Sequence, residues 1–215
     1  MTLANNLNQG LHALQLNLSQ SIQTQLLNYL DLLAKWNRVY NLTAVREVTQ
    51  MVPKHVFDSL AVLPYVCGSK ILDVGTGAGL PGLLLAIACP DWQCFLLDSN
   101  AKKIRFVTQA IIELEIKNAL AVHTRVEAFE HIVDNETTEK FSTVISRAYT
   151  NLPNFFQQTK RLVATGGCLL AMKGVYPETE IAQMAQLPVL LETFRLQVPQ
   201  LPAQRHLVVI RPLVV

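Results

Sequence analysis

The fold of this 215-residue chain is decided by one stretch, Lys70-Ile71-Leu72-Asp73-Val74-Gly75-Thr76-Gly77-Ala78-Gly79-Leu80-Pro81-Gly82. Its first five residues are mostly aliphatic, which is typical of a buried strand. The glycines that follow let the backbone approach a ligand that side chains would keep away. In an open α/β sheet, ligands bind outside the carboxyl ends of the strands. The stretch therefore predicts a strand, a ligand-binding loop and the start of a helix.

The rest of the chain after this stretch alternates between short apolar runs and helical segments. Strands are predicted at 70–74, 94–98, 119–123, 142–146 and 167–173, with helices at 81–88, 102–115, 126–132 and 152–162. Such alternation indicates a mostly parallel sheet. The last two runs, 190–198 and 206–211, are separated only by a proline-containing loop, so they predict an antiparallel pair at the sheet edge. The predicted class is a Rossmann-like α/β fold with seven strands.

The first part of the chain has a different pattern. Apolar residues recur at helical spacing over 18–36, and a second helix is predicted over 51–65, beginning near Pro53 because proline suits a first helical turn. Residues 1–66 are therefore expected to form an N-terminal helical appendage. Residues 67–215 are expected to form the α/β domain that holds the ligand.

Composition limits the class of protein. With 50% hydrophobic and 16% charged residues, the chain has the composition of a globular domain. A net charge of +2 is too small to indicate a nucleic-acid binder by itself. The N-terminus lacks the pattern of a signal peptide and no run is long and apolar enough to span a membrane, so a cytoplasmic monomer is expected. The four cysteines lack C-x-x-C spacing, and no metal site is predicted.

The glycine loop permits two kinds of cofactor. Counted from Gly77, it fits the G-x-G-x-x-G pattern of a dinucleotide site, so an NAD-dependent reductase stays an alternative. Asp73 favours another ligand, because a carboxylate beside the loop would repel a pyrophosphate. The same charge would attract the ammonium and sulfonium groups of S-adenosylmethionine. A cofactor of that kind is therefore predicted.

Two further positions support a nucleoside-containing cofactor. Asp98 ends the second strand, close to the spacing of about 20 residues from the first glycine at which a carboxylate binds ribose hydroxyls. Glu127 follows the third strand and is expected beside the adenine. Val126 is expected to contribute its backbone amide there.

The fourth strand leads into Ser146-Arg147-Ala148-Tyr149. This segment is neither the Asn/Asp-Pro-Pro-aromatic tetrad of amino-directed methyltransferases nor a Pro-Cys pair that would attack a pyrimidine carbon. An acceptor that is already nucleophilic, such as guanine nitrogen-7, fits what remains, with positioning supplying most of the rate. Arg147 is the predicted catalytic residue, and its guanidinium suits either the cofactor carboxylate or an RNA phosphate.

Several longer motifs make the chain resemble the bacterial small-subunit ribosomal RNA guanine-N7 methyltransferases of the G family, also called the glucose-inhibited division protein B family. The resemblance covers almost the whole chain. It rests on Lys35-Trp36-Asn37-Arg38-Val39-Tyr40-Asn41-Leu42-Thr43, His55 with Asp58-Ser59, Asp73 to Gly82, Asp98-Ser99 with Lys103, Arg125-Val126-Glu127, Ser146-Arg147-Ala148, Met172-Lys173-Gly174 and Arg205-His206-Leu207-Val208-Val209-Ile210.

The resemblance implies a class I methyltransferase fold, S-adenosylmethionine as donor, and methylation of a guanine in the decoding-region hairpin of 16S ribosomal RNA. The partner would be this RNA or the small ribosomal subunit. The predicted cofactor set is Asp73, Gly75, Thr76, Gly77, Gly79, Leu80, Asp98, Val126, Glu127 and Arg147; the predicted RNA set is Asn41, Arg46, His55 and Lys103. The acidic stretch 133–140 is expected to stay away from RNA.

Two other interpretations remain open at this point. In a small-molecule methyltransferase, the helical appendage would be a lid over the acceptor. In a non-enzymatic RNA-binding module, RNA would bind without regard to the cofactor. Basic residues near aromatic ones in the appendage suit RNA, but a solvated helical face has the same composition.

Overall fold

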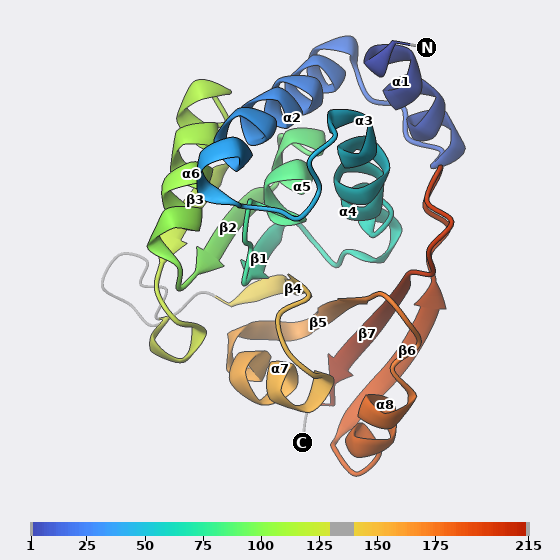
Figure 1. The fold of residues 1–215 in the computed structure, drawn as a ribbon. Helices are drawn as coiled ribbons and strands as arrows, with labels where there is room; N and C mark the ends of the chain where they lie inside the picture. The colour runs from blue at the N-terminus through green and yellow to red at the C-terminus, as the bar shows by residue number, and fades with distance from the viewer. Residues whose placement is uncertain (1, 130–139, 214–215) are drawn as a thin grey trace.

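The computed structural model describes residues 2–129 and 140–213, which form one mixed sheet flanked by helices (Figure 1). The sheet is seven-stranded with the order β3-β2-β1-β4-β5-β7-β6. Strand β7 runs antiparallel to β5 and β6, and the other strand pairs in the described part of the chain are parallel. The predicted fold class and the predicted antiparallel pair at the sheet edge are therefore confirmed. The strands are β1 Lys70–Val74, β2 Gln93–Asp98, β3 Ala119–His123, β4 Phe141–Arg147, β5 Val163–Lys173, β6 Val189–Arg195 and β7 His206–Pro212.

Each face of the sheet is covered by its own hydrophobic cluster, because successive side chains of a strand point to opposite faces. Ile71 belongs to one cluster and Leu72 to the other. The first face is covered by α1 Leu3–Ala13, α2 Gln20–Tyr40, α3 Val48–Met51, α4 Asp58–Leu60, α5 Gly82–Ala88 and α6 Ala101–Glu113; the second is covered by α7 Leu152–Thr159 and α8 Glu178–Met184 (Figure 1). Helices α1 and α8 were not predicted. Helix α8 has only seven residues, whereas the leucines at 3, 7, 11 and 14 have helical spacing and α1 was overlooked.

The predicted helix at 18–36 is confirmed and continues to Tyr40. The hydroxyl of Ser19 accepts a hydrogen bond from the amide of Ile22 and caps its start. The second predicted helix begins earlier than expected, at Val48 rather than near Pro53. Pro53 lies inside a π-helical turn, Val52–Phe57, because a proline lacks the N–H that an α-helical ladder needs.

The helical appendage packs directly on the sheet domain. The Tyr29 hydroxyl donates a 2.7 Å hydrogen bond to the carbonyl of Ala78 in the glycine loop. Gly10 of α1 faces the ring of Phe57 so closely that a Cβ would lie 1.9 Å from it. Buried residues of both parts share one hydrophobic cluster. The appendage is thus part of the continuous core, and the boundary between 66 and 67 stays a prediction.

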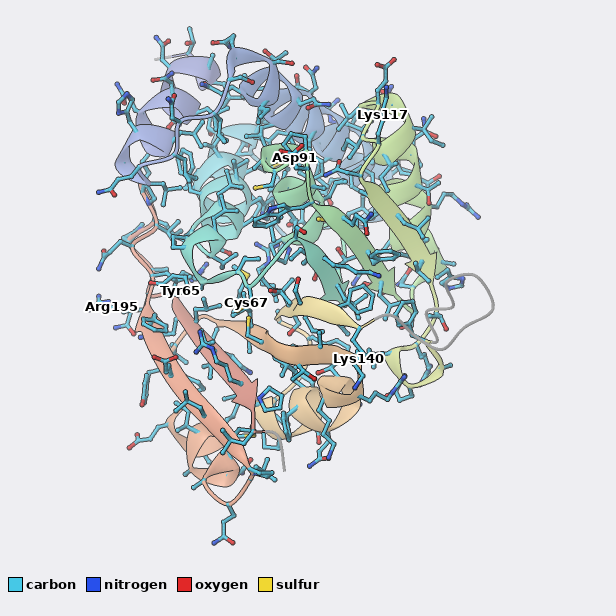
Figure 2. All side chains as sticks on the ribbon, turned by 180° about the vertical axis from the view of Figure 1, so that it is seen from behind. Tyr65, Cys67, Asp91, Lys117, Lys140 and Arg195 are labelled. Atoms are coloured by element: carbon cyan, nitrogen blue, oxygen red, sulfur yellow. The ribbon has the colours of Figure 1, made fainter. Side chains whose placement is uncertain are left out.

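The connection from the appendage to β1 packs on the first face of the sheet, together with the appendage helices. Figure 2 shows Tyr65 beside the end of β6, near Arg195. The ring centroids of Tyr65 and Phe194 are 4.6 Å apart. The Cys67 amide and carbonyl both bond to the hydroxyl of Thr143 in β4. These contacts fix the entry of the chain into β1, and therefore the position of the loop that follows it.

Two predicted segments fall largely outside the described residues. Of the helix expected at 126–132, the structure describes a 3-10 turn, Val126–Ala128, and residues up to 129. The acidic stretch expected at 133–140 lies outside the described residues except for Lys140.

Candidate active site

The carboxyl ends of the parallel strands enclose a pocket of about 340 Å³ at the point where the strand order reverses between β1 and β4. This is where ligands bind in open α/β sheets. Its wall combines backbone at the end of β1 with polar side chains from the loops after β2, β3 and β4. The lining residues are Val74, Gly75, Leu97, Asp98, Ser99, Lys103, Thr124, Arg125, Val126, Glu127, Ala148 and Tyr149.

The backbone amides of the glycine loop already donate hydrogen bonds within the protein. The amides of Gly75 and Thr76 both donate to the Leu97 carbonyl, at 2.8 and 2.9 Å. Those of Gly79 and Leu80 donate to the carbonyl of Thr76. The amide of Gly82, at the start of the following helix, donates to Asp73, so these amides are occupied by partners within the chain. A pyrophosphate needs such amides, so the loop does not suit a dinucleotide.

Asp73 lies beneath the loop rather than in the pocket. It has 0% exposure, and its Oδ2 accepts hydrogen bonds from the Thr76 hydroxyl at 2.6 Å and the Gly82 amide at 2.8 Å. Burial raises the pKa of this carboxyl to about 6. The carboxylate holds the loop in shape from behind, and a direct contact of Asp73 with the cofactor stays a prediction. Thr76, Gly77, Gly79 and Leu80 likewise do not line the pocket.

Asp98 lies at the pocket wall, where the sequence expected it. Its Oδ2 accepts a 2.9 Å hydrogen bond from the Gly77 amide, and its Oδ1 accepts one of 2.8 Å from Asn100. Lys103 approaches the same carboxylate to 3.8 Å and also lines the pocket. Lys103 was expected on the RNA side, and the structure instead puts it beside Asp98, because the helix that carries it begins directly after β2.

Val126 and Glu127 line the opposite wall. Arg161 donates to the carbonyl oxygens of Val126, at 2.7 Å, and Phe129, at 3.0 Å, and so fixes this turn. The side chain of Gln158 donates to the Glu127 carboxylate at 3.0 Å. The turn that is expected to bind the adenine is therefore held in place by Gln158, at the end of α7, and by Arg161, just beyond it.

The turn after β4 closes the pocket. Ala148 has a φ of +54°, a conformation that costs energy for a residue with a Cβ. This conformation directs the chain so that the ring of Tyr149 packs over Gly75. A Cβ on Gly75 would lie 2.7 Å from the tyrosine ring. The Tyr149 hydroxyl donates to Gln158 at 2.9 Å. Glycine is required at 75 because a tyrosine occupies the space of its side chain.

A second pocket, of about 460 Å³, adjoins the first. Ala148 lines both. The second pocket lies between the appendage and the ends of β4 and β5, and its wall is rich in cationic side chains. It is lined by Val45, Lys54, His55, Asp58, Arg147, Ala148, Met172, Lys173, Gly174 and Arg205.

Arg147 lies in this second pocket and not in the first. Its Nη1 donates to the Asp58 carboxylate at 3.0 Å and to the Lys54 carbonyl at 3.2 Å. The other carboxylate oxygen of Asp58 accepts a hydrogen bond from Arg205 at 2.9 Å. One buried carboxylate thus orients two guanidinium groups toward one pocket. Whether Arg147 contacts the cofactor or the acceptor stays a prediction.

His55 is buried in the wall of the second pocket. Its Nε2 lies 3.1 Å from the Thr43 hydroxyl. Burial, and then the charge of Arg147, lower the pKa of the imidazole to about 4. His55 is therefore neutral at neutral pH and a weak base.

The motif around Asn37 builds the loop after α2. The buried side chain of Asn37 binds the Val45 carbonyl and the Thr43 amide. Asn41 ends α2 with a φ of +51°, and its side-chain oxygen accepts a 2.6 Å hydrogen bond from Arg46. Asn41 and Arg46 thus lie together on an exposed loop, and their predicted contact with RNA stays a prediction.

Sequence reasoning assigned no role to several residues that the structure brings to the two pockets. Asp58, Arg205 and Arg125 stand within the quoted motifs, so a signal was present. Tyr149 stands beside the quoted Ser-Arg-Ala motif. Tyr29, which lines neither pocket but supports the glycine loop, carried no such signal. Their importance depends on contacts between distant parts of the chain.

With this geometry in view, comparison with known proteins decides the family. A model of the family described as rRNA small subunit methyltransferase G matches residues 22–208. The chain belongs to this family. It is 49% identical to the ribosomal RNA small subunit methyltransferase G of Laribacter hongkongensis, over 97% of this chain and 98% of the relative. The protein of the same description from Nitrosospira multiformis is 45% identical, over 98% of both chains.

Solved structures support the fold. An O-methyltransferase of Streptomyces achromogenes superposes with a TM-score of 0.61 and 13% identity, over 99% of this chain and 100% of that chain. A SAM-dependent methyltransferase of Aquifex aeolicus gives 0.55 and 17%, over 75% and 92%. The class I methyltransferase fold is confirmed by these superpositions.

Membership of the family confirms the rRNA methyltransferase class and S-adenosylmethionine as methyl donor, and it decides against a reductase. No helix in the described part of the chain is long and apolar enough to cross a membrane.

Proposed function

We propose that this chain transfers the methyl group of S-adenosylmethionine to nitrogen-7 of a guanine in the decoding-region hairpin of 16S ribosomal RNA. The observation that carries the proposal is the pair of pockets joined at Ala148. One is bounded by carboxylates suited to a nucleoside, and the other is cationic. Donor and acceptor bound in such neighbouring pockets are held close, and positioning of this kind supplies a large part of the rate of a bimolecular reaction.

The first pocket is assigned to the donor. Asp98 would bind the ribose hydroxyls, with Val126 and Glu127 beside the adenine and the Gly75 backbone beneath the nucleoside. The fit rests on two features of this pocket. Asp98 is held at its wall by backbone amides, and Tyr149 leaves no room for a side chain at Gly75. S-adenosylmethionine, when bound, supplies an electrophilic methyl group on a sulfonium. The chain itself would orient the donor.

The second pocket is assigned to the acceptor. Asp58 is the acidic residue among the described residues that line it, and both of its oxygens accept hydrogen bonds from arginines. His55, with a pKa of about 4, is a weak base. This wall therefore offers little to remove a proton. Guanine nitrogen-7 carries a lone pair and needs no such removal, which makes it the acceptor that this pocket suits.

Cations around the second pocket suit an RNA substrate. Arg147 and Arg205 are oriented by Asp58, and Lys173 is held by the Thr150 carbonyl and Glu180 at 3.0 and 2.8 Å. Guanidinium groups bind phosphates and carbonyl edges through fixed pairs of donors. We assign Arg147 to the acceptor side, where it would position the guanine. Asn41, Arg46 and His55 would complete the RNA side. We also place the reaction in the cytoplasm, with the enzyme as a monomer.

The test is transfer of labelled methyl from S-adenosylmethionine to small ribosomal subunits, and to deproteinised 16S RNA, from a strain that lacks this gene. Mass spectrometry of nuclease digests would identify the modified base. A single 7-methylguanine in the decoding-region hairpin is expected. A methyl group on another atom or in another RNA would overturn the proposed position while leaving the methyltransferase class intact.

A further inference from the structure

Two large hydrophobic side chains lie exposed at the rim of the second pocket. Val175 is 72% exposed and Tyr176 is 51% exposed. They follow Lys173 and Gly174, which line the pocket, and they precede Pro177, which is buried. The segment joins β5 to α8 (Figure 1). Neither side chain belongs to the hydrophobic clusters on the two faces of the sheet.

Tyr176 is held in place although it is half exposed. Its ring meets the ring of His206 edge-on, with centroids 5.7 Å apart and an interplanar angle of 77°. His206 is buried and follows Arg205, which lines the pocket. An aromatic ring oriented in this way loses little freedom when a ligand stacks on it. The rim therefore presents a preorganised flat surface beside the cationic pocket.

Gly174 leaves the approach to this surface open. A Cβ at this position would meet no atom within 4 Å, and its φ is outside the left-handed region. Neither crowding nor backbone conformation thus requires glycine here. The absence of a side chain gives a ligand room between the pocket and the ring of Tyr176.

We propose that Tyr176 and Val175 form a stacking surface for a base next to the acceptor nucleotide in single-stranded RNA. The inference rests on the proposed function, which assigns the acceptor guanine to the same pocket. The cations Lys54, Arg147, Lys173 and Arg205 lie around this pocket and complement the charge of a phosphate backbone. Proteins bind unpaired RNA by combining such cations with exposed aromatic rings that stack on bases.

The first test is steady-state kinetics of methyl transfer to deproteinised 16S RNA. Tyr176→Ala is expected to raise KM for RNA by roughly tenfold. This change lies within the free energy that the stacking of one base on an aromatic ring contributes. The kcat at saturating RNA and the Kd for S-adenosylmethionine are expected to stay unchanged. Tyr176→Phe retains the ring and is expected to behave as wild type. Ile112→Ala is the matched control, since Ile112 is 65% exposed on α6 away from both pockets.

The second test uses Gly174→Leu. Because the position is sterically open, the midpoint of urea unfolding of this variant is expected to equal that of the wild type. Its Kd for the donor is also expected to be unchanged. Its KM for RNA is expected to rise as for Tyr176→Ala, because the added side chain occupies the approach to the ring. An effect of Gly174→Leu on unfolding would point to a structural role instead.

The outcomes separate the inference from the function on which it rests. If the wild-type protein methylates no guanine nitrogen-7 in small ribosomal subunits or in deproteinised 16S RNA, the proposed function fails. If the wild type is active and the KM of Tyr176→Ala for RNA equals that of the wild type and of the control Ile112→Ala, the stacking surface is refuted. If Tyr176→Phe loses as much as Tyr176→Ala, the hydroxyl rather than the ring is responsible, which also refutes stacking.

Discussion

The carboxylate of Asp58 accepts a 3.0 Å hydrogen bond from the guanidinium of Arg147, joining the N-terminal helices to the end of β4. Asp58 is 2% exposed and also binds Arg205. The appendage therefore does more than cover the sheet, since it orients two arginines that line the second pocket. A lid that opens and closes would have to break these ion pairs.

Arg147→Ala is expected to lower methyl transfer by about 100-fold or more, because it removes the group that positions the acceptor. The Kd for S-adenosylmethionine, measured by calorimetry, is expected to stay close to wild type. Asp58 loses one charged partner but keeps Arg205, so a loss of about 2 kcal/mol in the free energy of unfolding is expected. The protein is expected to remain folded. Near-normal turnover would contradict the assigned role.

Asp58→Asn is the control for that prediction, since it weakens the same ion pair while leaving the guanidinium in the chain. Turnover of Asp58→Asn is expected to fall less than that of Arg147→Ala. If the two variants lose equal activity, Arg147 acts only through the ion pair and does not position the acceptor itself.

Asp98→Ala is expected to raise the Kd for S-adenosylmethionine by roughly tenfold or more, because a hydrogen bond to a charged group contributes about 1.5 to 3 kcal/mol. Asp98→Asn keeps one carbonyl oxygen for the Gly77 amide and is expected to lose less. Isothermal titration calorimetry measures both, with Asp91→Ala as a surface control. An affinity of Asp98→Ala equal to wild type would rule out the ribose contact.

Asp73 is expected to give stability an unusual dependence on pH. Its pKa is about 6 in the folded protein and 3.8 ordinarily, so between these values the folded state holds a proton that the unfolded chain has released. The contribution of Asp73 to stability therefore falls as the pH rises through this window. Asp73→Asn keeps an oxygen for Thr76 and Gly82 but does not titrate.

Urea unfolding of wild type and Asp73→Asn, below and above the window, checks this prediction. The wild type is expected to lose stability relative to the variant as the pH rises from about 4 to about 6 and to show no further relative change above it. Other titrating groups contribute equally to both proteins and cancel. A relative stability that is constant over the window would show that the carboxyl is not destabilised by burial.

Tyr29→Phe tests whether the appendage supports the glycine loop. The variant loses a buried 2.7 Å hydrogen bond to the Ala78 carbonyl, which is expected to cost about 1 kcal/mol of unfolding free energy. The Kd for S-adenosylmethionine is expected to rise a fewfold, because the loop is less firmly held. Tyr40→Phe, on the exposed end of the same helix, is the control. A change in stability without a change in Kd would limit Tyr29 to a structural role.

The sequence by itself determined the sheet and the place of the first pocket, which we propose holds the donor. Strand alternation, the glycine loop after β1 and the carboxylate at Asp98 are local signals, set by residues a few positions apart. Local hydrophobic periodicity and the backbone freedom of glycine fix such features before the chain folds. The boundaries of β1 to β4 could be predicted to within one residue for the same reason, whereas β5 begins at Val163 rather than at the predicted Gly167. Helix α8 was missed because its few residues are stabilised mainly by packing against α7.

Only the tertiary structure decided how the site works. Asp58 and Arg147 are 89 residues apart, and Asp58 and Arg205 are 147 apart, so no local pattern could pair them. The inward position of Asp73 depends on hydrogen bonds that form only once the loop has closed. The sharing of Ala148 by the two pockets depends on the chain reversing its strand order between β1 and β4. Long-range contacts of this kind arise from the packing of the whole chain, which is why the residue types were visible beforehand and their partners were not.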